Sequence, residues 1–488
     1  MRRQWVFETL DTTTTTLLRS NIFNRILELE KLKTTVEDDP SQILVVLGPR
    51  SCGKTALLSS HFSARRDAVY INCRLFDATT PQDFVKEVLT VLIHNMSTLI
   101  EDKDSWEQLK RSLPPKILAG FASGFKITMR GAEMKSWAYS LSELVKSIMS
   151  EDPAKNEEPD MNALIKAFKL LLDAWEKAIV TKSGEIMRRP VIVIDEANVM
   201  MGWNKNYPED MGTLLRFFVS ITKEQKRSHV FLVTSEYGYQ TWLSEAIASE
   251  FWAPRIIGDF TKSEAKSFFE FELQRRRKVV TVTDEIWSQI YEVCGGNAGT
   301  LVSLAKAVED SGDDLNSKWE KALKSMYRNT ELPRLEMLAL GVDGVYTAAQ
   351  FADAALLMLS SPHFAVPQKA MLELLGRHDY ALDIQGDNTP SQDQLRSAGQ
   401  KILKGLVKYN VLCLRPYSDW ALDIPLQAYS GPGEWALVTP PSALALYCLK
   451  LMKPDLVTCL TEWKQKQAPK AQQKECKDER KEERKEGF

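Results

Sequence analysis

The sequence predicts an α/β protein in which helices flank a parallel sheet, followed by a helical lid and a C-terminal winged-helix-like domain. Three apolar, β-branched runs predict buried parallel strands at residues 42–47, 191–195 and 230–234, and residues 68–73 predict a further strand. Segments with helical spacing of apolar residues separate these runs, as in successive strand–helix–strand units. From residue 261 the pattern is helical, and strand-like runs return only near 411 and 434.

Length and composition indicate an ordinary multidomain protein. The chain has 488 residues, of which 44% are hydrophobic and 26% charged, with a formal net charge of −2. This balance gives no global attraction to nucleic acid or to an anionic membrane, although it leaves a local basic surface open. No apolar run is long enough to span a bilayer, so we expect no membrane association.

The cysteines and the first residues of the chain give evidence about the cellular location of the protein. The seven cysteines contain no CxxC pair, which argues against a zinc site or a disulfide framework and favours a reducing compartment. We therefore expect a cytoplasmic protein. The first residues weakly resemble an organellar transit peptide, against which Glu8 and Asp11 count, and a nuclear or organellar location stays open.

The stretch between the first strand and the next helix fits G-x-x-x-x-G-K-[ST], the phosphate-binding loop. Its two glycines let successive backbone N–H groups converge on phosphate oxygens, and the following helix adds its positive end. Lys54 is placed to reach the β- and γ-phosphates and the Thr55 hydroxyl to bind Mg²⁺. We expect the Lys54 head to be solvated when the loop is empty. The expected nucleotide-binding residues are Gly48, Pro49, Arg50, Ser51, Cys52, Gly53, Lys54, Thr55 and Ala56.

A second apolar run, 191–194, ends in two acids, Asp195 and Glu196. Because parallel strands share their carboxyl edge, this run delivers both carboxylates where the phosphate-binding loop also lies. Asp195 is then expected to hold Mg²⁺ through water. Glu196 is expected to polarise the water that attacks the γ-phosphate.

Two further catalytic candidates follow. The strand at 230–234 leads into Thr234 and Ser235, whose hydroxyls would lie between the other two strands and reach the γ-phosphate or the water. A hydroxyl is also common at any junction of strand and loop. Arg255, which precedes a short apolar segment, would complement phosphate charge in cis or in trans; an ordinary surface arginine explains it equally well.

Pattern changes along the chain predict its division into regions. The nucleotide-binding core contains a helical insertion, and the tail is a Lys/Glu/Gln mixture with little to bury, so we expect it to be disordered, as solvated coil or as a lone helix. The expected regions are an N-terminal segment at 1–22, the core at 23–260 with its insertion near 101–154, a helical lid at 261–340, the winged-helix-like domain at 341–460 and the charged tail at 461–488.

Together these motifs resemble the archaeal-type ATPase family of P-loop NTPases, within the STAND/AAA+ group, over residues 23–304. An opening signature of phenylalanine, arginine, glutamate and leucine is matched by Phe23, Arg25, Glu28 and Leu29, and Leu32 extends it. The loop and the Asp-Glu-Ala sequence are similar to the Walker A and Walker B motifs. Other matches are Ser235 at the sensor position, Arg255 at a glycine–arginine pair that here reads Pro254-Arg255, and Gly295-Gly296-Asn297 at a turn where Ala298 replaces proline. The resemblance implies ATP rather than GTP, and a lid and winged helix that change state with the nucleotide.

Three functions remain open at this point. The first is a Mg²⁺-dependent ATPase that acts as a nucleotide-driven conformational switch for an unidentified protein partner. The second is a nucleic-acid-binding protein in which ATP licenses the winged helix, because Arg396, Lys401, Lys404 and Lys408 give the helix at 392–409 a basic character that a solvated helix face also explains. The third, a small-molecule kinase, is disfavoured by the additional C-terminal regions. The partner and the oligomeric state are not predicted.

Overall fold

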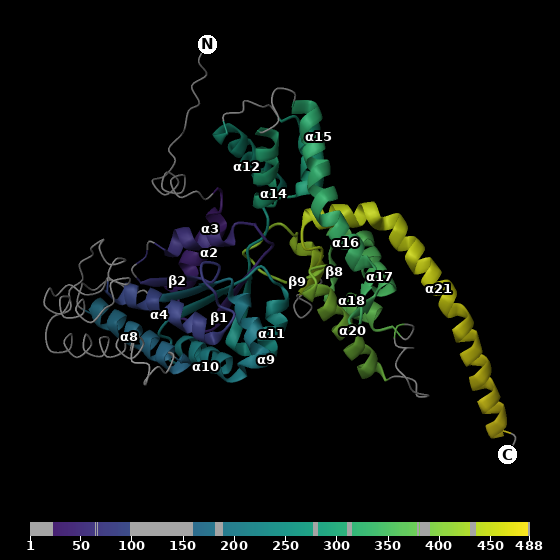
Figure 1. Ribbon diagram of the computed structural model, residues 1–488, viewed down its shortest axis with the longest axis horizontal. Helices are drawn as coiled ribbons and strands as arrows, with labels where there is room; N and C mark the ends of the chain where they lie inside the picture. Colours follow the sequence, from purple (N-terminus) through teal and green to yellow (C-terminus); the bar gives the residue numbers. More distant parts are fainter. Residues whose placement is uncertain are drawn as a thin grey trace, which may run out of the picture. The chain divides into compact units, whose positions relative to one another are not determined.

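The computed structural model describes two compact units (Figure 1). Unit 1 comprises Met1–Gly48, Gly53–Ser235 and Tyr239–Ile257, and unit 2 comprises Pro49–Cys52, Glu236–Gly238 and Gly258–Phe488. Within these spans the structure describes residues 23–63, 65, 67–97, 160–180, 189–276, 282–309, 315–377, 380, 391–429 and 436–486. The expected N-terminal segment at 1–22 and the insertion near 101–154 lie outside the described residues.

Unit 1 is built on a five-stranded parallel sheet in the order β2-β3-β4-β1-β5, which confirms the predicted fold class. Every residue of the three inner strands β3, β4 and β1 is buried, as expected for a sheet that is covered on both faces. The strands are β1 (Ile43–Leu47), β2 (Ala68–Asn72), β3 (Val191–Asp195), β4 (His229–Val233) and β5 (Trp252–Ile256).

Helices cover the sheet of unit 1 (Figure 1). An aromatic cluster of Phe168, Phe217 and Phe218 joins two of them, α8 and α10. The helices are α2 (Ile26–Glu37), α3 (Lys54–Phe62), α4 (Pro81–Ser97), α8 (Met161–Val180), α9 (Trp203–Asn206), α10 (Pro208–Val219) and α11 (Gly238–Ala246). The segments with helical spacing between the predicted strands include α3, α4 and α8, whereas α9, α10 and α11 were not predicted.

The edge strand β5 corrects one expectation. Arg255 was predicted to precede a short strand, but it lies inside β5, which begins at Trp252 and includes Pro254. Proline has no N–H for a sheet hydrogen bond. An edge strand tolerates proline because it has a sheet neighbour on one side only, and β5 pairs with β1 alone.

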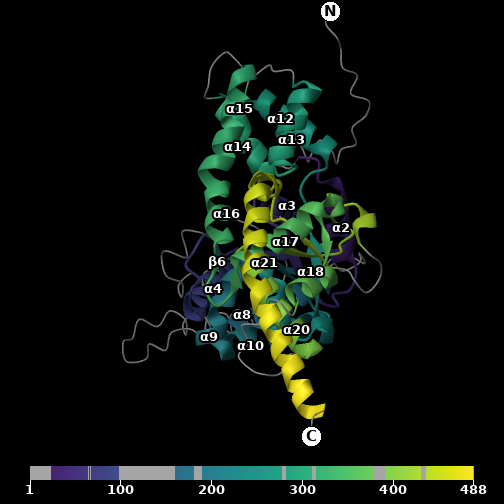
Figure 2. The same ribbon diagram turned by 90° about the vertical axis from the view of Figure 1, so that its right-hand side faces the viewer.

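Unit 2 begins with a bundle of helices that follows Gly258 (Figure 2). Its first helix starts with a capping box, in which Thr261 and Glu264 satisfy backbone N–H groups reciprocally. Phe269 packs against Trp287 of the next helix. These helices are α12 (Lys262–Arg275), α13 (Asp284–Cys294), α14 (Ala298–Glu309), α15 (Leu315–Met326) and α16 (Leu332–Ala339).

The rest of the described part of unit 2 consists of helices and short strands. Its three-stranded antiparallel sheet has the order β8-β10-β9; the two-residue strand β8 was too short to be recognised from the sequence. A second sheet pairs β6 with β7. The elements are β6 (Gly341–Val342), β7 (Tyr346–Thr347), α17 (Ala348–Ser360), β8 (Val366–Pro367), α18 (Gln368–Leu375), α20 (Gln392–Lys408), β9 (Cys413–Pro416), β10 (Ala436–Thr439) and α21 (Ala443–Glu486).

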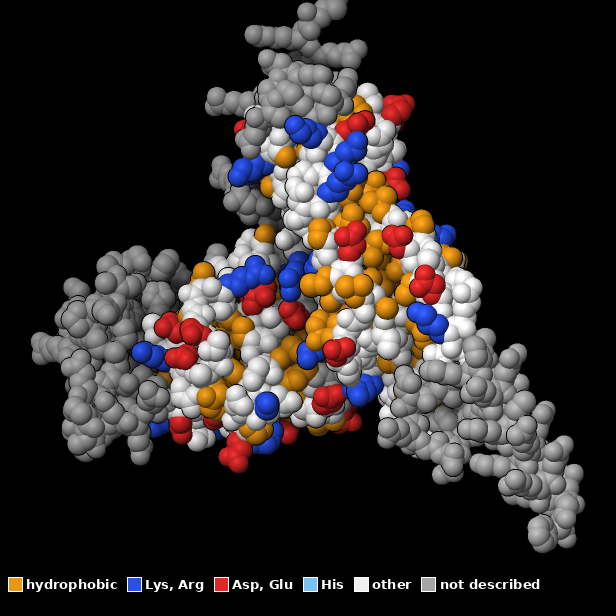
Figure 3. Space-filling view, turned by 45° about the vertical axis from the view of Figure 1, so that its right-hand side comes forward, with side chains coloured by type: hydrophobic (Ala, Val, Ile, Leu, Met, Phe, Trp, Pro, Cys, Tyr) orange, Lys and Arg blue, Asp and Glu red, His pale blue; other side chains and the backbone are white. Residues whose placement is uncertain are grey.

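The surface of unit 2 includes exposed apolar side chains. Figure 3 shows hydrophobic side chains among charged ones on the face that it presents. Met337 and Leu340 at the end of α16 are largely exposed, and Leu451 and Val457 on the neighbouring helix α21 are nearly half exposed. Among the described residues, no helix is long and apolar enough to cross a membrane.

Helix α21 continues to Glu486, so the tail is helical there, which is one of the two forms expected for it. Lys, Glu, Gln and Ala are good helix formers, and a helix whose first turns are packed extends at little cost. Leu456 and Leu460 on α21 are buried, and Trp463 packs against Tyr380.

Removing residues 464–488 is therefore expected to leave the melting temperature and ATP affinity of the protein unchanged. The described side chains beyond Trp463 contribute little burial. A chain ending at 455, which also loses Leu456, Leu460 and Trp463, should melt several degrees lower. Differential scanning fluorimetry of the two truncations makes the comparison; an equal loss in both would contradict it.

Buried His229 at the start of β4 predicts a pH dependence of stability. Burial, the first cause, lowers its pKa from 6.5 to about 4, against the raising effect of its contact with the Asp38 carbonyl oxygen, 3.1 Å from Nε2. Between these values the unfolded state binds more protons, so the free energy of unfolding falls as pH decreases from 6.5 to 4, by on the order of 3 kcal/mol.

The matched variant is His229→Gln, which keeps a donor for the Asp38 carbonyl oxygen but does not titrate. Urea unfolding at several pH values should show a shallower dependence for this variant in the window from pH 6.5 to 4. Parallel curves for the two proteins would show that another group causes the acid sensitivity.

Candidate functional site

The phosphate-binding loop, residues 48–55, connects the buried strand β1 to helix α3. Gly53 has φ = +102° and lies immediately before α3, a conformation that L-residues with side chains rarely adopt. A Cβ there would meet nothing within 4 Å, so the constraint is conformational rather than steric. Ser51 is also left-handed, with φ = +61°. The loop therefore curls as the glycine spacing predicts.

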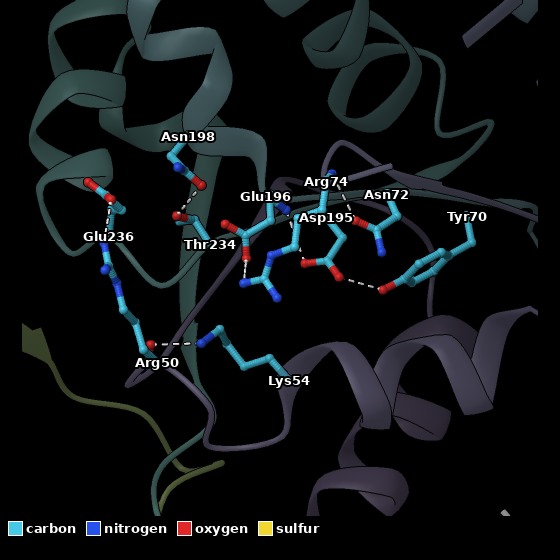
Figure 4. Close-up of polar contacts among 11 residues, drawn as sticks. Arg50, Lys54, Tyr70, Asn72, Arg74, Asp195, Glu196, Asn198, Thr234 and Glu236 are labelled. Carbon is cyan, nitrogen blue, oxygen red and sulfur yellow. Dashed lines mark hydrogen bonds and ion pairs between the residues drawn. The ribbon is translucent and has the colours of Figure 1, made fainter. Parts of the chain in front are cut away.

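Lys54 differs from the expected solvated state. Its side chain is only 6% exposed, and Nζ donates a hydrogen bond of 2.8 Å to the carbonyl oxygen of Gly48 (Figure 4). A buried ammonium needs acceptors, and the end of β1 supplies one. The expectation was wrong because it treated the loop as open.

Asp195 ends β3 with its carboxylate buried at 1% exposure. Oδ2 accepts a 2.6 Å hydrogen bond from the Tyr70 hydroxyl, and Oδ1 accepts one of 3.0 Å from the backbone N–H of Glu196. Burial and then the charge of Asp195 raise the pKa of Tyr70, which keeps the phenol protonated as a donor. Burial, with Asp195 and Glu196, also raises the pKa of Cys73 to about 12, so this neighbouring thiol is not a nucleophile.

Glu196 follows Asp195 in a left-handed conformation, with φ = +59°. Such strain in a residue with a Cβ is characteristic of functional positions. Its side chain, 13% exposed, accepts a hydrogen bond from the guanidinium of Arg74, which itself is largely exposed. The backbone N–H of Arg74 donates to Oδ1 of Asn72 at the end of β2. Figure 4 shows Arg74 directed at Glu196 from the neighbouring strand.

The strand β4 lies between β1 and β3, as expected from its hydroxyl-bearing end. Thr234 is fully buried, and its hydroxyl donates a 3.0 Å hydrogen bond to Oδ1 of Asn198. Ser235, the predicted sensor, is buried at the next position. The carboxyl ends of β1, β4 and β3 thus carry the loop, these hydroxyls and the two acids on one edge of the sheet.

No described hydrogen bond connects Arg255 with these residues at the carboxyl edge of the sheet. It pairs in register with Val46 of β1, and its Nη1 donates 2.9 Å to the carbonyl oxygen of Pro254. Its predicted catalytic role stays a prediction.

The middle of the loop, Pro49–Cys52, belongs to unit 2. Arg50 forms an exposed ion pair of 3.0 Å with Glu236, Cys52 is fully buried, and the Cys52 N–H lies 3.4 Å from the Pro49 carbonyl oxygen. At the other end, Thr55 is half-buried and Ala56 exposed in the first turn of α3.

A magnesium ion fits this set of donors. The described residues contain no group of three or more His, Cys, Asp or Glu side chains that would hold a metal by themselves. Mg²⁺ at a nucleotide site instead takes one or two protein oxygens, with phosphates and waters completing its shell. Thr55 and Asp195 would provide those oxygens, since each Asp195 oxygen has a second lone pair beyond its described hydrogen bond.

Sequence reasoning missed Tyr70, Asn72, Arg74 and Asn198. Tyr70 lies in the middle of β2, Asn72 ends the strand and Arg74 follows it. Tyr70 and Arg74 contact residues more than 120 positions away. A polar residue ending a strand was a usable signal at Asn72. It pointed to the site only once β2 was known to be the neighbour of β3.

Comparisons with known proteins agree with this geometry. The profile of a family described as "ATPase domain predominantly from Archaea" matches residues 22–304. Two uncharacterised ATP-binding proteins of Pyrococcus abyssi are 28% and 29% identical over 295 and 307 residues, covering 60% and 62% of this chain and 75% and 76% of theirs. An uncharacterised ATP-binding protein of Methanocaldococcus jannaschii is 25% identical over 301 residues, covering 59% of this chain and 70% of its own.

Among solved structures, the ORC2 protein of Aeropyrum pernix, determined as ADPNP and ADP complexes, aligns with a TM-score of 0.42 at 13% identity. The alignment covers 90% of this chain and 97% of that one. The family profile spans more than half of the chain, including the loop and both acids. The chain therefore belongs to the family of ATPase domains found predominantly in Archaea.

Proposed function

We propose that this protein binds ATP together with Mg²⁺, hydrolyses it slowly or when stimulated by a partner, and uses the nucleotide as a conformational switch. The observation that carries the proposal is the meeting of three features on one sheet edge of unit 1. These are the Lys54 loop after β1, the Asp195–Glu196 pair after β3, and Thr234 and Ser235 after β4. The family and the names of the relatives support ATP as the ligand.

Each residue has a distinct task in the proposed reaction. Backbone N–H groups of the loop and the Lys54 ammonium bind the phosphates, and a bound Mg²⁺ would neutralise charge on the β- and γ-oxygens. Thr55 and Asp195 would hold that ion, with Tyr70 and the Glu196 N–H keeping the Asp195 carboxylate oriented.

Glu196 acts as the general base that takes a proton from the attacking water. Its strained backbone and its contact with Arg74 fix the carboxylate before the substrate arrives. Ser235 is the proposed sensor of the γ-phosphate, and Arg255 a proposed charge complement. The lid at 261–340, the winged-helix-like domain at 341–460 and the charged tail remain proposed divisions of unit 2.

The switch is supported by contacts of the middle of the loop within unit 2. Asn297 donates to the Arg50 carbonyl oxygen, and the Gly299 N–H donates to the Ser51 carbonyl oxygen. A nucleotide that orders the loop therefore acts on the residues that hold it at the start of α14. Phosphate release tests the ATPase, and limited proteolysis with ATP, with ADP and without nucleotide tests the switch. Identical digestion patterns in the three states would contradict a switch, and production of a phosphorylated small molecule would favour the kinase instead.

A second candidate, nucleic-acid binding licensed by ATP, is favoured by α20. Arg396, Lys401, Lys404 and Lys408 are all exposed on this helix, while Ile402, Leu403, Leu406 and Val407 are buried. The basic face is thus available to a phosphate backbone. A solvated face of an amphipathic helix has the same appearance, so binding must be measured.

Charge reversal tests this candidate. Lys401→Glu with Lys404→Glu should weaken DNA or RNA binding and flatten its dependence on salt, by about two units of the logarithmic slope if both lysines contact phosphates. Lys321→Glu with Lys324→Glu on α15 is the control, because these exposed lysines have the same spacing. If the two double variants bound nucleic acid with the same affinity and the same salt dependence in a gel-shift series, α20 would be excluded as the nucleic-acid interface.

A further inference from the structure

Within unit 2, the middle of the phosphate-binding loop is held by Asn297, just before α14, and by Gly299 in the first turn of that helix. Nδ2 of Asn297 donates a 2.9 Å hydrogen bond to the Arg50 carbonyl oxygen, and the Gly299 N–H donates one of 3.0 Å to the Ser51 carbonyl oxygen. The backbone at Gly299 lies very close to the loop, since a Cβ on Gly299 would lie 2.4 Å from the Ser51 Cβ. Two consecutive carbonyl groups of the loop are therefore anchored.

The side-chain amide of Asn297 makes four described hydrogen bonds, and these determine which way the amide is oriented. Oδ1 accepts from the N–H and the hydroxyl of Thr300, at 3.1 and 3.0 Å, and so caps α14. Nδ2 donates to Oδ1 of Asp259 at 3.0 Å as well as to Arg50. A flipped amide would place Nδ2 against the Thr300 N–H, so only this orientation satisfies both ends. Asn297 is 4% exposed.

The network extends from Asp259 to the connection between β9 and β10. The Asp259 N–H donates 3.2 Å to Oδ2 of Asp423, and Oδ1 of Asp423 accepts from the guanidinium of the buried Arg415 on β9. A Cβ on Gly258 would lie 2.3 Å from Oδ1 of Asp423, so the carboxylate presses against the chain where the helical bundle begins.

We propose that Asn297 is a positioning residue that couples Asp423 to the Arg50–Ser51 peptide and thereby sets the affinity of the loop for nucleotide. The proposal rests on the proposed function. The peptide unit is planar and trans, so holding the Arg50 carbonyl oxygen toward Asn297 directs the Ser51 N–H the opposite way. Loop N–H groups bind phosphate only when so directed. A displacement of Asp423 would thus be transmitted through Asp259 and Asn297 to the loop and would change nucleotide affinity.

The test separates the donor function of Asn297 from its capping function. Asn297→Ser keeps a good helix cap but is too short to reach Arg50 and Asp259. Thr283→Ala is the control, because it removes the side-chain cap of the adjacent helix α13 without touching the loop. Arg415 and the Asp259 N–H donate to different oxygens of Asp423. Asp423→Asn replaces one of these oxygens with an NH₂ group, which cannot accept, so one of the two hydrogen bonds is lost.

Affinity is measured with a fluorescent ATP analogue, and hydrogen exchange of the Ser51 amide is measured on nucleotide-free protein. Asn297→Ser should weaken affinity at least about tenfold and speed this exchange, while Thr283→Ala changes neither by more than about twofold. Asp423→Asn should weaken affinity less. The double variant Asn297→Ser with Asp423→Asn should match Asn297→Ser alone, because residues in one series of contacts are not additive.

Equal effects of Asn297→Ser and Thr283→Ala on both readouts would overturn the proposal, as would additive effects in the double variant. These outcomes are distinct from failure of the proposed function, in which the wild-type chain itself binds no nucleotide. Melting temperatures of all variants identify any that do not fold, and the comparison of Asn297→Ser with Thr283→Ala decides the proposal even if Asp423→Asn unfolds.

Discussion

Replacing Glu196 with Gln is expected to leave ATP bound and to slow its hydrolysis by two orders of magnitude or more. The amide has the same shape and can still accept a hydrogen bond from Arg74. It cannot take up a proton from water, and general-base contributions of about 10² to 10⁴ set the size of the loss. Phosphate release and equilibrium binding in the same buffer separate the two effects.

Two comparisons make the Glu196 result specific. Glu209→Gln, at an exposed position of α10, should hydrolyse ATP at the wild-type rate. Asp195→Asn should behave differently, weakening nucleotide binding in the presence of Mg²⁺, because its single oxygen cannot serve Tyr70, the Glu196 N–H and a metal-bound water together. Wild-type turnover by Glu196→Gln would mean that another group positions the water.

Replacing Lys54 with Ala is expected to reduce ATP affinity by one to two orders of magnitude. Hydrogen bonds to charged groups contribute about 1.5–3 kcal/mol each, and the affected site is partly dry. The variant also leaves the buried Gly48 carbonyl oxygen without the Lys54 donor, so a modest fall in melting temperature should accompany the loss.

Lys205→Ala, at an exposed position of α9, is the control for Lys54. Isothermal titration with ATP measures the affinity, and circular dichroism confirms that both variants are folded. Unchanged affinity in Lys54→Ala would remove the phosphate-binding loop from the account, whatever the result for Glu196.

Local sequence patterns predicted those parts of the site whose functional residues are close together in the sequence. The loop needs glycines, a lysine and a hydroxyl in a fixed spacing, and β3 needs a β-branched run before its acids. The strand pairing then confirmed that β4 lies between them. These elements could be predicted because the residues that specify each of them lie within a short stretch of the sequence.

The remaining contacts depend on which distant segments the fold brings together. Arg74 reaches Glu196 only because β2 pairs with β3, and Asn297 reaches Arg50 across 247 positions of sequence. No local pattern encodes either neighbour. Lys54 is an intermediate case, since its role followed from the motif, whereas its burial and hydrogen bond to Gly48 depended on the packed loop.

The central claim is that the chain binds ATP through this loop together with Mg²⁺. Titration of the full chain with ATP, with Mg²⁺ and then with excess EDTA, tests it most directly. We predict saturable binding at one site that is markedly weaker without the metal and is competed by ADP. Absence of binding in both conditions by folded protein would contradict the account.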